Sequence, residues 1–264
     1  MEPQNHNPYA PPAAVILDDD LSVADGKFIP GGRRVPAGNG FSWIGTGWHY
    51  FRQSPLNWAA LALIFGVLWI VISIIPGVNF LASVIFPIFT GGMMIACENQ
   101  RRTGSLAIGD LFAGFQQKLG ALAIVGLISL GVMLASMIPL IVVFGLSFAG
   151  AVLGGAHGVP SLGSVSVSMM ILGGLLVVVM SCVTWSLLWF APALVTLQNQ
   201  APIEALKNSF LGCWRNPLAG MLYGIGAFIV LILGMIPLFL GLFVVMPMLV
   251  VSIHAGYRDI FLED

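Results

Sequence analysis

Residues 201–237 read APIEALKNSFLGCWRNPLAGMLYGIGAFIVLILGMIP, and they show the plan on which the chain is built. Their first half mixes charged residues with an apolar stripe at helical spacing, made of Ile203, Leu206, Phe210 and Trp214. Such a stripe on a short polar segment is typical of an amphipathic helix that lies in the membrane interface. Their second half is almost wholly apolar and long enough to cross the bilayer. The stretch therefore predicts an interfacial helix followed by a membrane span.

The same plan occurs in residues 41–76 and 106–139. In each copy the semi-polar segment ends in an aromatic residue, with an apolar residue three positions earlier, and the next span closes with Ile-Pro. The paired residues are Trp48 and Phe51, Phe112 and Phe115, and Leu211 and Trp214; the prolines are Pro76, Pro139 and Pro237. We expect the paired residues to anchor their helices at the interface; the alternative is a solvated helix packed on the bundle. The spacing predicts three internal repeats, at about 39–98, 99–198 and 199–261.

The composition places the chain in a membrane. Of its 264 residues, 58% are hydrophobic and 8% are charged, whereas about a quarter of the residues in a soluble domain are charged. The apolar runs are continuous, which indicates helices, because a membrane β-barrel shows alternating polarity. We predict an all-α polytopic membrane helix bundle whose six spans pair as three hairpins. The spans are roughly 56–75, 78–97, 121–145, 167–197, 218–236 and 239–257.

The basic residues predict the orientation of the bundle. Every Lys and Arg lies before the first span, after the last span, or in the connections that follow the second and fourth spans. By the positive-inside rule, both termini and these two connections are cytoplasmic. Residues 1–38 are rich in Pro, Gly and Asp without periodicity, which predicts a disordered cytoplasmic tail. Residues 39–261 then form one transmembrane domain, and residues 262–264 form a cytoplasmic C-terminus.

Residues 139–166 leave three arrangements open. The segment is apolar, rich in glycine and uncharged. Either spans 3 and 4 are long and tilted, or the segment re-enters the membrane, or the chain has eight short spans. In each case the charged connections require an even number of crossings.

Residues 201–218, with the span after them, resemble six-span inner-membrane proteins of Gram-negative bacteria, a family whose function is not established. More distantly, they are similar to the membrane domain of some glycerophosphodiester phosphodiesterases. Members of this broad group often carry an Ala-Leu-x-x-Ser-aromatic segment before a hydrophobic hairpin. The matching residues are Ala205, Leu206, Ser209 and Phe210. The resemblance covers most of residues 38–261 and implies an inner-membrane location, but no phosphodiesterase activity, because no such catalytic domain is found.

The predicted spans carry no ionisable residue in their interior. A charge at the bilayer centre costs about 2.5–3.5 kcal/mol, so one found there would mark a functional site. Glu98 lies at the end of the second span beside Arg101 and Arg102, which favours a salt-linked interfacial residue over a substrate site. The lack of buried acids argues against a pump with a carboxylate relay. We therefore predict that the chain is not an enzyme and has no catalytic residue.

No metal or cofactor site is expected either. His157 and His254 lack a second ligand at i+3 or i+4, and Met133 and Met137 are expected to serve as packing residues. Three cysteines without CxxC spacing argue against a disulfide framework. A net charge of −1 does not suggest a nucleic-acid partner.

Several span residues are candidates for a functional or packing role. Prolines inside spans break helices, as in transporters, and the dipeptide Asn-Gln recurs before two of the semi-polar segments. The candidates are Glu98, Asn99, Asn199, Trp185, Pro87, Pro192 and Pro247.

Two functions remain in view. The first is a membrane scaffold or regulator that uses its polar cytoplasmic face to engage lipid or a protein partner. The second is a carrier or channel for an apolar or amphiphilic, lipid-like substrate, which prolines and glycines within the spans would allow to open. A carrier should contain a lipid-sized cavity between its repeats, whereas a scaffold should be a closed bundle. The missing ionisable site favours the scaffold.

Overall fold

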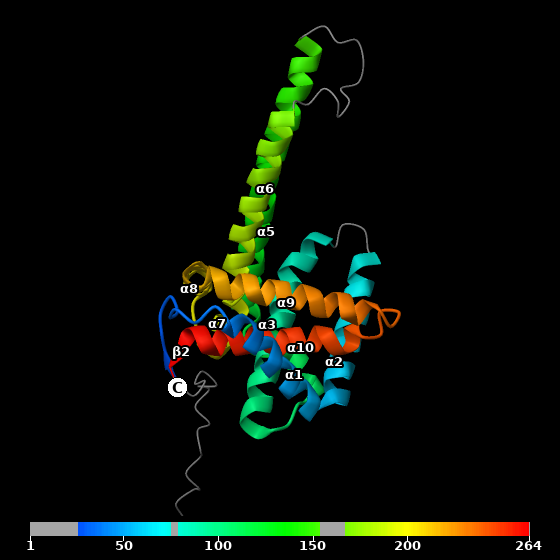
Figure 1. Cartoon of the computed structure of the whole chain (residues 1–264), viewed down its shortest axis with the longest axis vertical. Helices are drawn as coiled ribbons and strands as arrows, with labels where there is room; N and C mark the ends of the chain where they lie inside the picture. Colours follow the sequence, from blue (N-terminus) through cyan, green and yellow to red (C-terminus); the bar gives the residue numbers. More distant parts are fainter. Residues whose placement is uncertain (1–25, 75–78, 154–166, 264) are drawn as a thin grey trace, which may run out of the picture.

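The structure, a computed structural model, describes residues 26–74, 79–153 and 167–263. In this part of the chain six helices are long and apolar enough to cross a membrane. They are α2 (Pro55–Ile74), α3 (Asn79–Thr103), α5 (Leu119–Leu153), α6 (Val167–Leu188), α9 (Pro217–Met235) and α10 (Leu242–Phe261). They pair as the hairpins α2–α3, α5–α6 and α9–α10, whose tips point in different directions (Figure 1). The predicted all-α polytopic bundle is confirmed.

Each hairpin is preceded by surface helices. These are α1 (Asn39–Gln53), the 3₁₀-helix η1 (Ile108–Phe112) with α4 (Ala113–Gln117), and α8 (Pro202–Arg215). We call the side of the bundle on which they lie the polar end. α8 is polar at positions 204, 207 and 208 and apolar between them, as the sequence pattern predicts.

One residue joins each surface helix to the span that follows it. These connectors are Ser54, Lys118 and Asn216. Their backbone angles agree closely, with φ of −144°, −135° and −125° and ψ of 59°, 27° and 45°. In each case the connector N–H donates to a carbonyl three or four residues earlier. Three corners of the same geometry support the predicted internal repeat.

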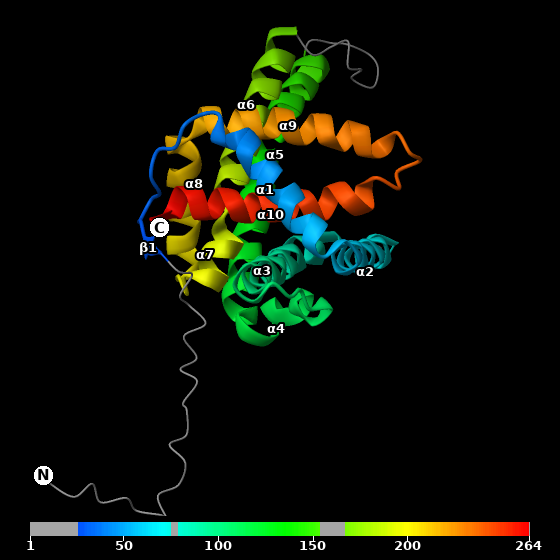
Figure 2. The ribbon, with the colours of Figure 1, turned by 60° about the horizontal axis from the view of Figure 1, so that its bottom comes forward.

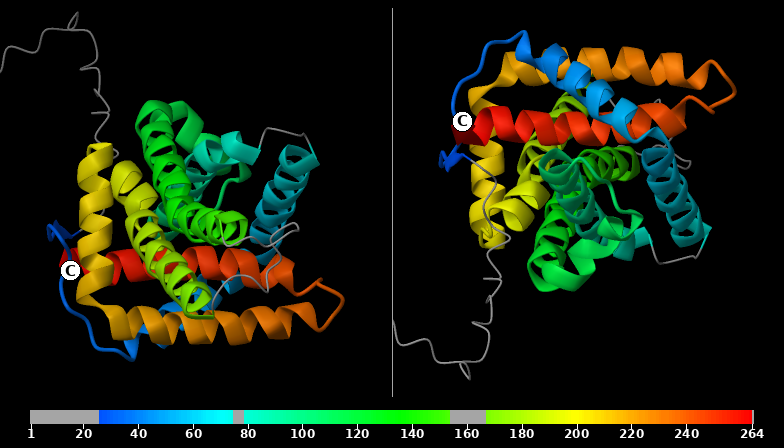
Figure 3. Two further views of the ribbon diagram at one scale, coloured as in Figure 1. Left: turned by 90° about the horizontal axis from the view of Figure 1, so that it is seen from above. Right: turned by 90° about the horizontal axis from the view of Figure 1, so that it is seen from below.

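The surface helices do not pack mainly on the spans that follow them. η1 and α4 pack on α3, at the end of the first hairpin, and α8 packs on α6 and α7 (Ala191–Leu197) of the second (Figure 2). α1 crosses α9 and α10 of the third hairpin (Figure 3). Each surface helix thus covers the hairpin of the preceding repeat, and the first repeat closes onto the last. The sequence pattern did not indicate this cyclic order.

Glycines allow the closest of these crossings. In α1, a Cβ at Gly40 would overlap the carbonyl oxygen of Ala219, and a Cβ at Gly47 would overlap that of Met248. Close backbone approach of this kind is the role of small residues between membrane helices. α1 therefore lies directly on the backbones of α9 and α10.

The N-terminal segment differs from the predicted tail. Residues 1–25 lie outside the described part, but residues 27–38 are ordered by contacts with distant elements. β1 (Lys27–Phe28) pairs antiparallel with β2 (Leu262–Glu263), near the end of the chain. The Gly31 N–H donates to Asn208 Oδ1 at 3.0 Å, and the Val35 N–H donates to Asn216 Oδ1 at 2.8 Å. Side-chain amides of α8 and its connector thus satisfy a backbone that has no periodic pattern of its own.

The third and fourth spans also differ from the prediction. α5 is one helix of 35 residues that continues through Pro139, so this proline does not end its span as Ile-Pro was expected to do. At 1.5 Å per residue α5 is about 52 Å long, more than the roughly 30 Å of hydrocarbon, which favours the long, tilted arrangement. The predicted fourth span, 167–197, matches one candidate span at Ile171–Leu197, but its helix is broken, because α6 ends at Leu188 and α7 follows as a separate helix. Residues 154–166 lie outside the described part.

The other predicted turns fit the structure where it describes them. α9 ends at Met235, two residues before Pro237, whereas Pro76 lies outside the described residues. Pro87 and Pro247 lie inside continuous helices. α3 and α10 are the most buried spans, while few residues of α2 and of the fourth span are buried. The centre of the bundle is therefore formed by the second helices of the first and third hairpins.

The crossing of α1 over the third hairpin can be tested with two glycines of the same helix. We expect Gly47→Ala to destabilise the protein by about 1–3 kcal/mol, because the new methyl group must displace the backbone of α10. Gly45 has open space around it, so Gly45→Ala should be neutral or stabilise by up to about 1 kcal/mol. Thermal unfolding in detergent measures both, and equal midpoints would contradict the close packing.

Candidate functional site

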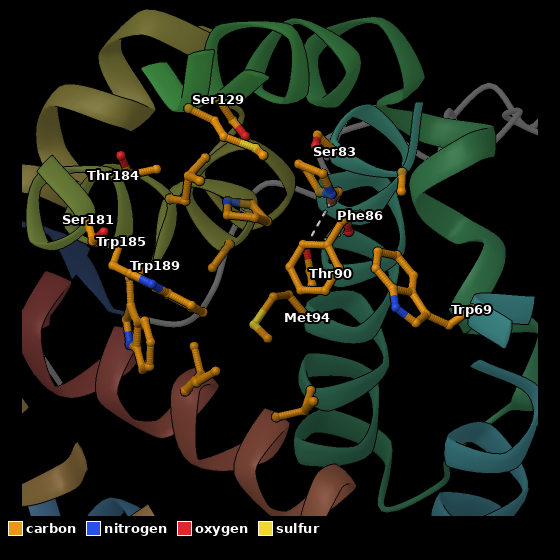
Figure 4. A pocket seen from close by; sticks show the side chains of 18 of the residues that line it. Trp69, Ser83, Phe86, Thr90, Met94, Ser129, Ser181, Thr184, Trp185 and Trp189 are labelled. Carbon is orange, nitrogen blue, oxygen red and sulfur yellow. Dashed lines mark hydrogen bonds between the residues drawn. The ribbon is translucent and has the colours of Figure 1, made fainter. Parts of the chain in front are cut away.

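A cavity of about 740 Å³ lies between the hairpins. Its walls come from α2, α3, α5, α6, α7 and α10, so all three hairpins contribute. Figure 4 shows Trp69 and Phe86 on one wall and Trp185 and Trp189 on the opposite wall. Its volume falls in the range of about 300–1,000 Å³ that is usual for small-molecule sites.

The lining combines aromatic and aliphatic surface with hydroxyl groups. Seven lining residues carry a hydroxyl: Ser73, Ser83, Thr90, Ser129, Ser136, Ser181 and Thr184. Among the described residues that line the cavity there is no Asp, Glu, Lys, Arg or His. The cavity is therefore an uncharged, amphiphilic space inside the membrane-spanning region.

Several of these hydroxyls donate to carbonyls of their own helix. Thr90 donates to Phe86 at 3.0 Å, Ser136 to Met133 at 2.6 Å, and Thr184 to Met180 at 2.8 Å. A hydroxyl that donates in this way keeps lone pairs with which it can accept a further hydrogen bond. The cavity wall thus offers acceptors at the depth of the spans.

The cavity is closed toward the polar end and open on its exposed side. Met94 and Ala193 at its base are buried, with 4% and 1% of their surface exposed. Trp185 and Met133, by contrast, are 62% and 46% exposed. A molecule in the cavity would reach it from the lipid rather than from the polar end.

The base of the cavity is shaped by the break between α6 and α7. In a continuous helix the Phe190 N–H would bond to the Ser186 carbonyl four residues earlier. Here Ser209 of α8 is placed between them: its hydroxyl accepts from Phe190 N at 3.0 Å and donates to Ser186 O at 2.8 Å. Pro192, which lacks an N–H, lies in the first turn of α7, where no N–H is needed for a helical hydrogen bond. The serine of the Ala-Leu-x-x-Ser-aromatic segment therefore stabilises a broken span.

Replacement of Ser209 tests this bridge. We expect Ser209→Ala to cost about 2 kcal/mol, because two buried backbone groups lose their partner. Amide hydrogen exchange at Phe190 should become faster in the variant than in the wild type. Ser42→Ala, which removes an exposed hydroxyl of α1, should change stability by less than about 0.5 kcal/mol. Unchanged exchange at Phe190 would contradict the assigned bridge.

A charged cluster lies directly below the cavity. On α3, Glu98 follows the lining residue Met94 by four residues, about 6 Å along the helix, and on α10, His254 directly follows the lining residue Ile253. Glu98 is 5% exposed and forms ion pairs with Arg101 at 2.8 Å and Arg102 at 2.9 Å. The carboxylate also lies 3.1 Å from His254 Nε2 and 3.7 Å from Arg258 Nη1.

Glu98 is thus occupied by partners from two helices, α3 and α10. Its carboxylate links the ends of the two most buried spans. This agrees with the predicted salt-linked role, and Glu98 is not part of the cavity lining.

Removal of this charge should destabilise the junction of α3 and α10. We expect Glu98→Gln to cost about 3 kcal/mol, because several partly buried cations lose their shared anion. The thermal midpoint should then fall by roughly 6–12 °C. Glu204 is exposed and has no ion pair in the described part of the chain, so Glu204→Gln is the control and should leave the midpoint nearly unchanged. Equal midpoints for both variants would show that the cluster contributes no stability.

The structure brings some of the other predicted site residues to the cavity and places the rest elsewhere. Trp185, Pro87 and Pro192 line the cavity. Asn99 donates to Asp110 Oδ2 at 3.1 Å, and Asn199 accepts a hydrogen bond from Lys118. These two asparagines therefore tie span ends to the polar end. Pro247 is buried within α10 and is not part of the cavity lining.

The six expected anchors are not equivalent. Trp214, Trp48 and Phe112 are 72%, 44% and 39% exposed, which suits contact with the interface. Phe51 is buried, and Phe115 and Leu211 are half-buried. Phe115 packs edge-on against Phe89 of α3, with ring centroids 4.9 Å apart. Within the apolar stripe of α8, Leu206 also faces the protein, so only part of each stripe is available to lipid.

The cysteines and histidines form no further site in the described part of the chain. No group of three or more His, Cys, Asp and Glu residues lies close enough to hold a metal ion there, and His157 lies outside the described residues. Burial raises the pKa of the Cys213 thiol to about 12, so the thiol stays protonated. Met133 and Met137, expected as packing residues, line the cavity.

The sequence pattern missed most of the hydroxyl and aromatic lining, although it singled out Trp185. Trp69, Thr90 and Ser136 stand alone in apolar runs, and nothing in their spacing joins them. The only sequence signal for this lining was the number of Ser and Thr residues within the spans. Whether these residues line one cavity depends on which hairpins pack together.

The chain is similar to a known membrane protein. It is 26% identical over 197 residues to a probable inner membrane protein of Burkholderia thailandensis, a match that covers 72% of this chain and 73% of that protein. No family model matches the chain, and no solved structure matches it. With its six apolar helices, this chain is an integral, multi-pass membrane protein. The comparisons do not support a link to glycerophosphodiester phosphodiesterases.

Proposed function

We propose that this chain is an inner-membrane protein that binds an amphiphilic, lipid-like molecule in the cavity and acts as its carrier. The observation that carries the proposal is the 740 Å³ cavity, which lies between all three hairpins and is closed at the polar end. Sites at the interface of repeats and beside broken helices are typical of transporters. Because a scaffold should be a closed bundle, the cavity favours the carrier over the scaffold.

Two further observations support the proposed membrane and orientation of the chain. The similar protein of Burkholderia thailandensis is a probable inner membrane protein, which supports the same membrane for this chain. The basic residues gather at the polar end, which supports a cytoplasmic location for that end and for both termini. On this orientation the cavity is closed toward the cytoplasm and reached from the bilayer.

Two neighbouring residues of α5 test the proposal. Ser136 lines the cavity, whereas Ala135 is exposed on the outer face of the same helix. We expect Ser136→Trp to fill the cavity and lower the lipid that co-purifies with the protein about tenfold, equivalent to about 1.4 kcal/mol of binding free energy. Ala135→Trp should retain wild-type lipid. The measurement is mass spectrometry of lipids bound to protein purified in mild detergent.

Matched thermal midpoints would show that both variants are folded. If wild type and both variants then carry the same small amount of lipid, the cavity is not a lipid site and the carrier proposal fails.

A further inference from the structure

Resting on the proposed function, we infer that the cavity takes an uncharged lipid alcohol, a lipid whose head carries a free hydroxyl and no ionised group. The first observation is depth. Ser129 and Ser136 lie ten and seventeen residues after the start of α5, which is about 15 and 25 Å along the helix. Thr90 lies thirteen residues before the end of α3, about 20 Å along that helix. These hydroxyls are therefore placed within the hydrocarbon region.

The second observation is the absence of charge in the lining. No charged or imidazole side chain is among the described residues that line the cavity. The nearest such cluster is centred on Glu98, and its carboxylate is shared by Arg101, Arg102 and His254. An ionised headgroup in the cavity would be desolvated without a counter-charge, which is strongly unfavourable. The cavity therefore selects against phosphate and carboxylate headgroups.

The third observation is the direction of the hydrogen bonds. The hydroxyls of Thr90, Ser136 and Thr184 already donate to their own helices. Their oxygens can accept, so a fitting ligand must bring donors. An alcohol does this without charge, whereas an ester or a hydrocarbon tail does not. Thr90 and Thr184 lie on opposite walls of the cavity (Figure 4), and Ser136 also lines it, so a lipid alcohol matches this lining.

The fourth observation is the exposed side of the cavity. Aromatic surface borders it, with ring centroids 5.6 Å apart for Trp69 and Phe86 and 5.6 Å for Trp185 and Trp189. Phe86 is 43% exposed and Trp185 is 62% exposed. An alcohol head can therefore enter between the hairpins while its tails pass between these aromatic walls into the bilayer.

The test uses the full chain in lipid nanodiscs with a photoactivatable diacylglycerol as the probe. Cross-linked peptides are identified by mass spectrometry, and unlabelled competitors are added in four arms. Two competitors are uncharged alcohols, diacylglycerol and a long-chain isoprenoid alcohol, and two are their phosphorylated counterparts. We expect labelling of α3 and α5 that the alcohols reduce at least tenfold more effectively than their phosphates. The stronger of the two alcohols identifies the tail chemistry.

A matched pair of variants tests the hydroxyls themselves. Thr90→Val keeps the shape of the side chain but removes the acceptor, and should weaken labelling about tenfold. Thr46 is half-buried on α1, outside the cavity lining, and also donates to its own helix, so Thr46→Val should label like the wild type. A methyl-capped diacylglycerol probe, which has no donor, should not distinguish Thr90→Val from the wild type.

The outcomes separate the two proposals. Competition by the phosphorylated lipids as strong as that by the alcohols would overturn the inference of an uncharged alcohol and leave the lipid carrier in place. Equal labelling of wild type and Thr90→Val by the uncapped probe would overturn it as well. Absence of any probe or co-purified lipid at α3 and α5 would overturn both.

Discussion

A backbone group within the hydrocarbon must find its hydrogen-bond partner inside the protein, because no water is present to serve it. Most of this chain meets that constraint with helices, and the break between α6 and α7 meets it differently. There the Phe190 N–H and the Ser186 carbonyl both bond to the hydroxyl of Ser209. This one side chain holds the broken span in place and fixes α8 on the second hairpin. The base of the cavity, at Pro192 and Ala193, begins directly after the break.

The cyclic order of the repeats gives the cavity its remaining walls. Each surface helix turns through a one-residue corner into its span and covers the hairpin of the preceding repeat. At the polar end the elements are held together by Asn208, Asn216 and the cluster around Glu98. Toward the tips the hairpins point apart (Figure 1). Because the helices contact one another at the polar end and the hairpins diverge toward their tips, a space remains between the spans.

The candidate site could be predicted only in part. Pro87, Pro192 and Trp185 stood out because a proline or a tryptophan in an apolar run has few ordinary explanations. Thr90 and Ser136 did not, because a hydroxyl bonded to its own helix is common in spans and carries no spacing signal. Only the packing of α3 against α5 shows that such residues face one space. The expected function changed for the same reason, since a sequence shows missing charges but not a cavity.

The sequence by itself determined that the chain is a helical membrane protein and where its spans begin, and it predicted three repeats that share one plan. Hydropathy and helical period are local properties, so they can be read along the chain. The tertiary structure alone decided that residues 27–38 are ordered, that the fourth span is broken, and that the first repeat closes onto the third. These features depend on hydrogen bonds and close approaches between residues far apart in sequence, as between Gly47 and Met248. Such contacts form only once the spans have packed.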